Sequence, residues 1–115
     1  MHGELKSFLE RLGYEVVLTA TEEESLRLLR DGKQVISLIL INQAAVSDVA
    51  LETARRIRAL AHLGEETPIV VLPSEFENEK EGSDQAVGPN DYKSYITTTD
   101  QLESLLKRVL PTNQG

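Results

Sequence analysis

Asn42 is the polar residue whose position in the chain points most directly to chemistry. It ends the run Val35–Asn42 (VISLILIN), in which six of eight residues are Val, Ile or Leu, without polar alternation. Such a run is typical of a strand buried on both faces of a parallel sheet, and ligands of open parallel sheets bind at the carboxyl ends of the strands. An amide forms hydrogen bonds but is a far poorer nucleophile than an ionised carboxylate. Asn42 therefore predicts either a ligand contact or a hydrogen-bonded polar residue at a strand end.

The remaining candidate groups form no catalytic or metal-binding pattern. Asp48 stands before an amphipathic stretch, where Asp suits the N-cap of a helix. His2 and His62 are sixty residues apart and have no supporting ligand at a useful spacing. The hydroxyls that lack a recognisable nucleophile setting are those of Ser7, Ser25 and Ser74. The sequence therefore predicts neither an enzyme nor a bound metal or other cofactor.

Length, charge and cysteine content narrow the class of protein. The chain has 115 residues, enough for a single domain over 1–115, with 113–115 expected to fray. It has no cysteine, which excludes disulfides and thiolate metal sites. The net charge of −7 argues against direct binding of nucleic acid, because phosphates require a basic surface. No apolar run could span a membrane and the N-terminus lacks a signal-peptide pattern, so we expect a cytoplasmic protein without membrane contact.

The elements expected before the central run are a helix, a strand and a second helix. Apolar spacings of three and four predict a helix over 4–12, which Gly13 should end in the left-handed conformation. A short strand is expected over 14–19. Thr21 and Glu24 then form a capping box at the start of the next helix.

The alternation continues after Asn42 with a helix over 49–61 and a strand over 68–72. The apolar stripe that should face the core of this helix consists of Leu51, Ala54, Ile57 and Leu60. The basic residues outside that stripe are Arg55, Arg56 and Arg58. We interpret them as a solvated helix face, with an acidic partner as the alternative.

The last third of the chain begins with a weak signal. Acidic residues dominate 73–90, which predicts either a short, poorly anchored helix or a mobile loop. A strand is expected over 92–97, and a capping box of Asp100 and Glu103 should open a final helix that ends at Pro111. The regular alternation predicts an α/β fold with a parallel sheet.

The order of these segments resembles the response-regulator receiver (CheY-like) domain family over nearly the whole chain. The matching segments are 9–17 (LERLGYEVV), 38–58, 68–72 (PIVVL), and Gly88 with 90–92. Within 38–58 the part most similar to the family is LETARRIR. The resemblance implies a flavodoxin-like three-layer fold, in which a parallel sheet of about four strands has helices on both faces and the N-terminal strand is missing.

The chain departs from the receiver pattern at each functional position. Where the family accepts a phosphoryl group on an aspartate, this chain has Asn42. Pro73 replaces the switch hydroxyl, and Tyr95, or Thr98 if the last strand shifts, replaces the lysine. The acidic pair that holds Mg²⁺ in the family would follow a first strand, but 1–3 (MHG) directly precede the first helix. The resemblance therefore implies a degenerate receiver, or pseudo-receiver.

The missing strand would be the centre of the family's sheet, between the strands expected at 14–19 and 35–42. These two strands either pair directly, through an ordinary right-handed crossover, or receive a strand from another copy of the chain or from a separate protein. An open gap would leave buried backbone groups unsatisfied, at roughly 1–3 kcal/mol each. Direct pairing is the preferred arrangement, and a homodimer formed by strand exchange is the alternative.

The resemblance implies a signalling module of two-component or phosphorelay type that binds a protein partner, such as a kinase, an output domain or a regulator, without phosphorylation. The docking residues that it implies are Tyr92, Tyr95, Ile96, Leu102 and Leu106. An exposed apolar patch is expected there. One alternative is a receiver phosphorylated on a non-standard carboxylate such as Asp48. The other is a small enzyme or ligand-binding protein whose crevice would contain Asn42, Pro73 and Ser74.

Overall fold

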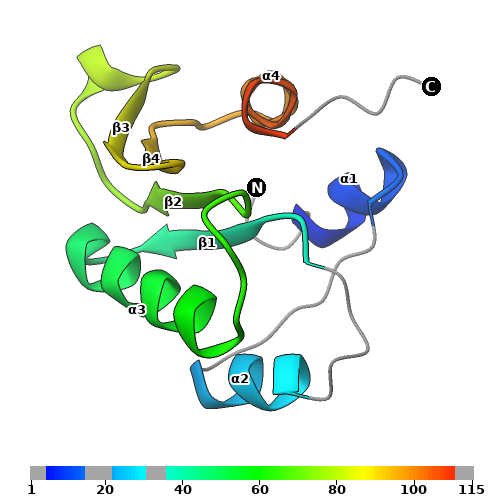
Figure 1. The fold of residues 1–115 in the computed structure, drawn as a ribbon. Coiled ribbons are helices and arrows are strands. Elements are labelled where there is room, and N and C mark those ends of the chain that lie inside the picture. Colours follow the sequence, from blue (N-terminus) through cyan, green and yellow to red (C-terminus); the bar gives the residue numbers. More distant parts are fainter. Residues whose placement is uncertain (1–4, 15–21, 31–35, 111–115) are drawn as a thin grey trace.

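The computed structural model describes residues 5–14, 22–30 and 36–110 of the chain (Figure 1). The strand expected over 14–19, apart from its first residue, and the predicted cap Thr21 lie outside these residues. The predicted direct pairing of that strand with the central strand also involves residues outside the described ranges. Within the described ranges, no helix is long and apolar enough to cross a bilayer.

A four-stranded, mostly parallel sheet forms the centre of the fold. Strands β1 (Ile39–Ala44), β2 (Ile69–Pro73) and β4 (Asp91–Ser94) run parallel, and β3 (Asp84–Gly88) lies antiparallel to β4. The strand order is β1-β2-β4-β3. The predicted α/β class with a parallel sheet is therefore confirmed, with one antiparallel edge strand that was not expected.

Strand β2 is buried on both faces, as its uninterrupted apolar sequence predicted. Val70 and Leu72 pack in one hydrophobic cluster, while Ile69 and Val71 pack in another. The first cluster includes residues of α1 (Leu5–Arg11) and α4 (Thr99–Val109). The second includes residues of α3 (Ser47–Leu60).

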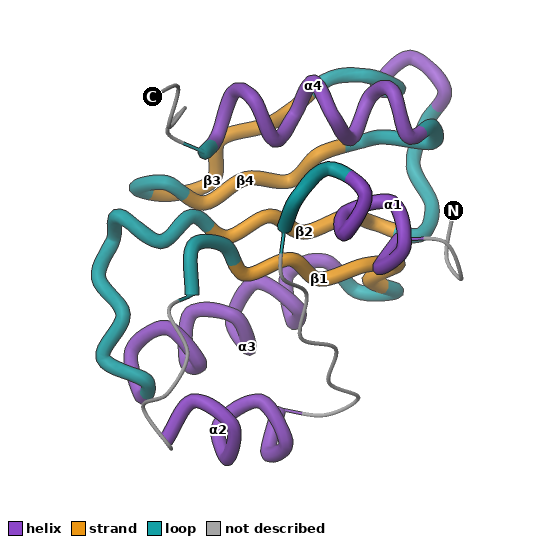
Figure 2. The backbone as a smooth tube through the Cα atoms, turned by 90° about the vertical axis from the view of Figure 1, so that its right-hand side faces the viewer, coloured by secondary structure: helices purple, strands orange, loops and turns teal. Residues whose placement is uncertain are grey.

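Helices consequently cover both faces of the sheet, with α1 and α4 on one side and α3 on the other (Figure 2). Helix α2 (Glu22–Arg30) packs on α3 and has no buried residue. The hydrophobic spacing of α1 correctly predicted a helix there, and Gly13 ends it with a φ of 97°.

Strand β1 differs from the predicted strand, 35–42, at both ends, because residues 36–38 are not part of it and it begins at Ile39. It continues through Asn42 to Ala44, so Asn42 lies inside the strand rather than at its end. Ile41 pairs with Val71 and Ala44 pairs with Pro73, which places three steps of β1 against two steps of β2. The extra residue makes a β-bulge. The amide is thus carried on an irregular stretch near the carboxyl end of the strand.

Residues 73–90 are neither the poorly anchored helix nor the mobile loop predicted for them. They contain a short 3₁₀ helix, η2 (Asn78–Lys80), and the edge strand β3. A two-residue turn of Pro89 and Asn90 joins β3 to β4, with Asn90 at a φ of 66°. Asn tolerates this left-handed conformation better than most residues. The Pro-Asn pair is therefore the local signal that could have predicted the hairpin.

The N-cap of helix α4 lies two residues before the predicted cap, Asp100. Thr98 is its N-cap, and Thr98 and Gln101 form a reciprocal capping box. The Thr98 hydroxyl accepts a hydrogen bond from the backbone N–H of Gln101 at 3.2 Å. The predicted box of Asp100 and Glu103 was wrong, because both residues lie inside the helix.

Candidate functional site

The carboxyl ends of β1 and β2 bring together the residues predicted for a crevice. Asn42 and Pro73 are partly buried, and Ser74 is exposed. The backbone N–H of Ser74 donates to the carbonyl oxygen of Ala44 at 3.0 Å, which ties the two strand ends together. An amide, a proline ring and a hydroxyl can form hydrogen bonds and contacts there, but none of them is an ionised nucleophile.

Asp48 is the acidic residue nearest in sequence to the carboxyl end of β1. Its side chain is 85% exposed, and its Oδ1 lies 2.7 Å from the Nζ of Lys93 on β4. The hydrogen bond from Lys93, together with the charge of that lysine, lowers the pKa of the Asp48 carboxyl. The predicted capping role was wrong, because the N-cap of α3 is Val46 and has no side-chain hydrogen bond. Asp48 instead connects the first turn of α3 to the sheet.

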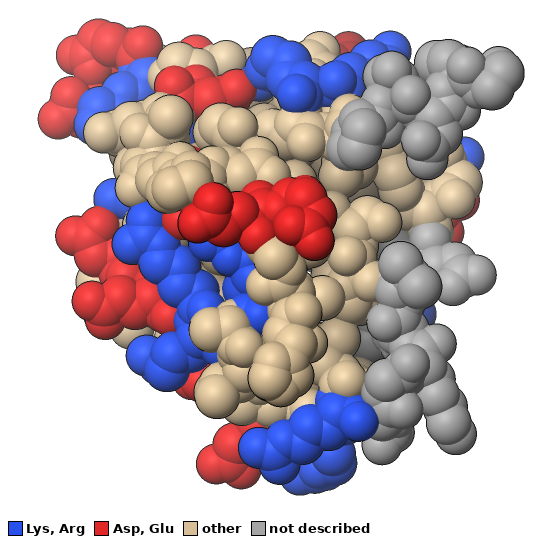
Figure 3. Space-filling view, in the orientation of Figure 1, with Lys and Arg blue, Asp and Glu red and all other residues tan. Residues whose placement is uncertain are grey.

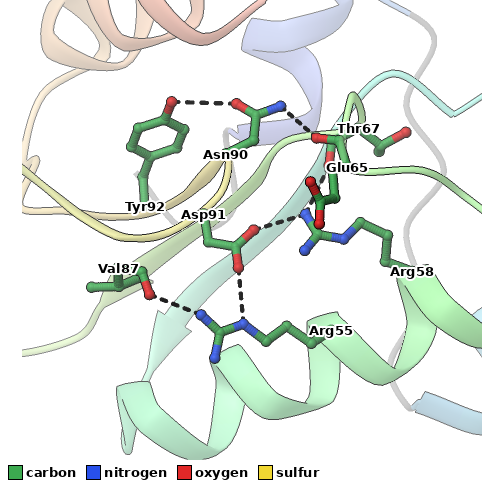
Figure 4. Close-up of polar contacts among 8 residues, drawn as sticks. All are labelled: Arg55, Arg58, Glu65, Thr67, Val87, Asn90, Asp91 and Tyr92. Atoms are coloured by element: carbon green, nitrogen blue, oxygen red, sulfur yellow. Dashed lines mark hydrogen bonds and ion pairs between the residues drawn. The ribbon is translucent and has the colours of Figure 1, made fainter.

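Asp91 is a buried carboxylate held by two arginines of α3 (Figure 4). It is 1% exposed. Its Oδ2 accepts a hydrogen bond from Arg55 Nε at 2.9 Å, and its Oδ1 accepts one from Arg58 Nη1 at 2.7 Å. The interpretation of both arginines as a solvated face was therefore wrong. A buried charge needs such partners, since an unpaired one is strongly destabilising.

The two arginines also hold backbone carbonyl groups of neighbouring segments. Arg55 Nη2 donates to the carbonyl of Val87 at 2.9 Å, and Arg58 Nη1 donates to that of Thr67 at 3.2 Å. The third arginine, Arg56, forms a double hydrogen bond with Glu22 of α2, at 2.8 Å for each. Arg55 and Arg58 thus both join α3 to Asp91 of β4, whereas Arg56 joins α3 to α2.

Gly88 provides the space for this network. A Cβ at Gly88 would lie 2.7 Å from Arg55 Nη2 and 2.7 Å from Asp91 Oδ2. The turn of Gly88 and Asp91 was recognised in the sequence, but its arginine partners were not. Arg55 and Arg58 are three residues apart and therefore lie on one side of a helix. This spacing could have predicted that they share a partner.

The five residues predicted as a docking face belong to the core or pack against it. Leu102 is 0% exposed and Leu106 is 2% exposed. Ile96 and Tyr95 are also buried, and Tyr92 is partly buried against the same cluster. The exposed apolar patch expected at these residues is therefore not present. Their side chains stabilise the packing of α4 and the sheet.

Tyr95 in particular anchors the segment after β2. Its hydroxyl donates to Gln85 Oε1 at 3.0 Å, and its ring meets Phe76 edge to face at a centroid distance of 5.3 Å. Lys80 Nζ lies 5.3 Å from the centre of the same ring. The residue at the expected lysine position therefore has a packing role.

The most exposed large apolar residues of the described ranges lie on α3 and in the loop before it, while Leu12 and Tyr14, after α1, are exposed to a smaller extent. Val46 is 59% exposed and Val49 is 57% exposed. Leu60, predicted to face the core, is 56% exposed at the other end of α3. Val46 and Val49 follow the carboxyl end of β1, and the sequence analysis did not single them out.

The two histidines and the acidic residues were considered as possible metal ligands in the sequence. His62 lies just after α3 with a φ of 58°, while His2 lies outside the described ranges. Among residues 5–14, 22–30 and 36–110, no three His, Asp or Glu side chains are grouped so as to hold a metal ion.

Comparison of the chain with protein-family models, with curated proteins and with solved structures found no match.

Proposed function

We propose that this chain is a receiver-like module of two-component or phosphorelay signalling that acts through protein–protein contact and does not depend on phosphorylation. The observation that carries the proposal is the amide of Asn42 near the carboxyl end of β1. Receivers hold their phosphoacceptor at this place in the sheet, and an amide oxygen does not form an acyl phosphate there.

The arrangement of β1, β2 and β4 supports the flavodoxin-like part of the proposal. These strands are parallel and adjacent in the sheet, and α3 connects β1 to β2. The antiparallel β3 departs from the receiver pattern, which has a helix between the last two parallel strands. The proposal therefore concerns a degenerate scaffold that retains the parallel strands and has replaced a helix with a hairpin.

The contacts of Lys93 and Tyr95 support a module with a single conformational state. Lys93 is paired with Asp48, and the ring of Tyr95 contacts both Phe76 and the ammonium group of Lys80. A phosphorylation switch requires side chains that change partners when the phosphoryl group arrives. Here these side chains are held by contacts on neighbouring elements, so binding of the partner would use a preformed surface.

The proposal is tested by incubating the chain with a small acyl phosphate and Mg²⁺ and then measuring its intact mass. A phosphorylatable receiver domain in the same tube controls for the activity of the donor. The expected mass is that of the unmodified chain. A stable added phosphoryl group would contradict the proposal.

Asp48 supports one alternative, phosphorylation on a non-standard carboxylate. It is exposed and adjoins the ammonium group of Lys93, which could hold a phosphoryl oxygen. In this case the acyl phosphate donor would transfer its phosphoryl group to Asp48, and Asp48→Asn would abolish the added mass. Asp84→Asn is the matched control, because Asp84 also pairs with a surface cation, Arg108. Equal labelling of both variants would exclude Asp48 as the acceptor.

A further inference from the structure

Helix α2 is amphipathic in sequence but has no buried residue. It packs on α3, and its Glu22 forms an ion pair with Arg56 of that helix at 2.8 Å. Figures 1 and 2 both show α2 on the side of α3 that faces away from the sheet. In Figure 3 acidic and basic side chains lie next to one another at the lower end of the molecule, where α2 lies. The helix is therefore an outer element with charged groups of both signs.

A hollow of about 280 Å³ runs along one side of α2 and is lined, among the described residues, by Glu23, Leu26, Arg27 and Arg30. We call these four residues the α2 side face. Their spacing of three and four residues places them on one face of the helix. The three charged residues are exposed, and Leu26 is partly buried. Within the described part of the chain, the charged groups of this face have no hydrogen bond or ion pair.

The charges of the α2 side face are self-complementary. The acidic residue lies near the start of the helix and the two basic residues lie toward its end. When two copies of a helix lie antiparallel about a two-fold axis, the start of each helix lies opposite the end of the other. An axis between Leu26 and Arg27 therefore places Glu23 opposite the partner's Arg30, and it does so twice. Leu26 then lies against the alkyl part of the partner's Arg27.

We infer that two copies of this chain associate through antiparallel contact of their α2 side faces. Each face carries one negative and two positive charges, whereas the whole chain has a net charge of −7. Two copies thus meet here with less repulsion than their net charge would impose elsewhere on the surface.

Other classes of partner fit this face less well. A uniformly acidic partner would bring like charge to Glu23, and a uniformly basic one would bring like charge to the arginines. Because a single pair of helices gives a small contact, the dimer is weak and exchanges with the monomer. The inference uses none of the residues on which the proposed function rests, so either can fail without the other.

Sedimentation velocity of the full chain, at concentrations rising into the millimolar range, tests the inference, and a reversible dimer is expected. Glu23→Arg should weaken the dimer by roughly tenfold or more, because each dimer then contains two contacts between arginines. Arg30→Glu should weaken it to a similar extent, since it creates two contacts between glutamates. An equimolar mixture of the two variants should recover the affinity of the original chain to within about threefold. In the mixed dimer both contacts again join opposite charges.

Glu10→Arg and Arg11→Glu are the matched controls, because they make the same charge changes at exposed positions of another helix, α1. They should leave the dimer affinity within about twofold of the original. They also account for the effect of net charge on association. Circular dichroism and the thermal midpoint should show that all variants are folded.

Several results would overturn the inference. A chain that stays monomeric throughout the concentration range would do so. A dimer that persists in both Glu23→Arg and Arg30→Glu would show that another surface, such as an exchanged strand, joins the copies. Failure of the two folded variants to associate when mixed, or an equal loss of affinity in the α1 controls, would also contradict the antiparallel arrangement.

Discussion

Asp91 shows how one residue can determine the arrangement of several elements. It is buried on β4, and its two arginine partners come from α3, 33 and 36 residues away in the chain. A carboxylate in this position is stable only while both oxygens are paired with cations or other donors. The network therefore selects the position of α3 on the sheet, beyond what apolar packing requires.

Asp91→Ala is expected to lower the free energy of unfolding by roughly 3 kcal/mol, because it leaves Arg58 largely buried without its carboxylate. Urea unfolding of the variant measures this loss. Asp84→Ala removes a more exposed ion pair, with Arg108, and should cost less than about 1 kcal/mol. Similar losses for the two variants would show that the buried network is not specially important.

Gly88→Ala should also be destabilising, by about 1–3 kcal/mol, because its new methyl group would overlap Arg55 and Asp91. In the double variant Gly88→Ala/Arg55→Ala, the overlap with the guanidinium is removed. The two changes should then cost less together than the sum of their separate costs. A double-mutant cycle in urea measures this coupling, and strictly additive costs would contradict the steric explanation.

At the scale of the elements, the sequence predicted most of the helices and strands whose residues follow a local apolar pattern. The helices α1, α3 and α4 follow from apolar periodicity, and the doubly buried β2 follows from its uninterrupted apolar run. The edge strand β3 was missed because most of its residues are exposed, so its sequence (DQAVG) has no apolar pattern. Its pairing depends on β4, and the sequence of β3 alone does not encode that contact.

Thr98→Ala distinguishes the observed cap of α4 from the cap predicted by the sequence. Loss of the Thr98 side chain should cost about 1 kcal/mol of unfolding free energy. Asp100→Asn should cost only a few tenths of a kcal/mol, because Asp100 interacts mainly with the helix dipole. Thermal or urea unfolding compares the two variants. A larger loss of unfolding free energy for Asp100→Asn than for Thr98→Ala would show that Asp100 caps the helix, as the sequence predicted.

Two ion pairs between elements predict how stability depends on pH. Hydrogen bonds from Arg56 lower the pKa of Glu22, and the hydrogen bond from Lys93 lowers the pKa of Asp48. A carboxylate whose pKa is lowered by folding contributes its stabilisation above its unfolded pKa, near 4, and loses it as the pH falls through the folded value.

Stability should therefore fall more steeply with acidification in the original chain than in Glu22→Gln/Asp48→Asn. Urea unfolding at a series of pH values between about 5 and 2 measures how the free energy of unfolding changes with pH in each protein. The difference should be small, since both carboxylates are solvent-exposed. Identical slopes would show that these pairs do not contribute to stability.

At the scale of the whole molecule, the sequence correctly predicted the layered α/β arrangement but not the location of its polar contacts. The amphipathic elements specify which faces become buried, and this determines the layers. The acidic partners of Arg55, Arg56 and Arg58 lie more than thirty residues away in the chain. No local spacing encodes such pairs. Leu102 and Leu106, predicted as part of a docking face, are buried in the core, whereas Val46 and Val49 lie outside it.

The central claim is that this module has one state, independent of phosphorylation. It is tested most directly by recording amide ¹H–¹⁵N NMR spectra of the full chain before and after addition of a small acyl phosphate with Mg²⁺. We predict that the signals of 42–49 and 91–95 keep their positions. Appearance of a second set of signals at these residues, lost again when the donor is removed, would contradict the account.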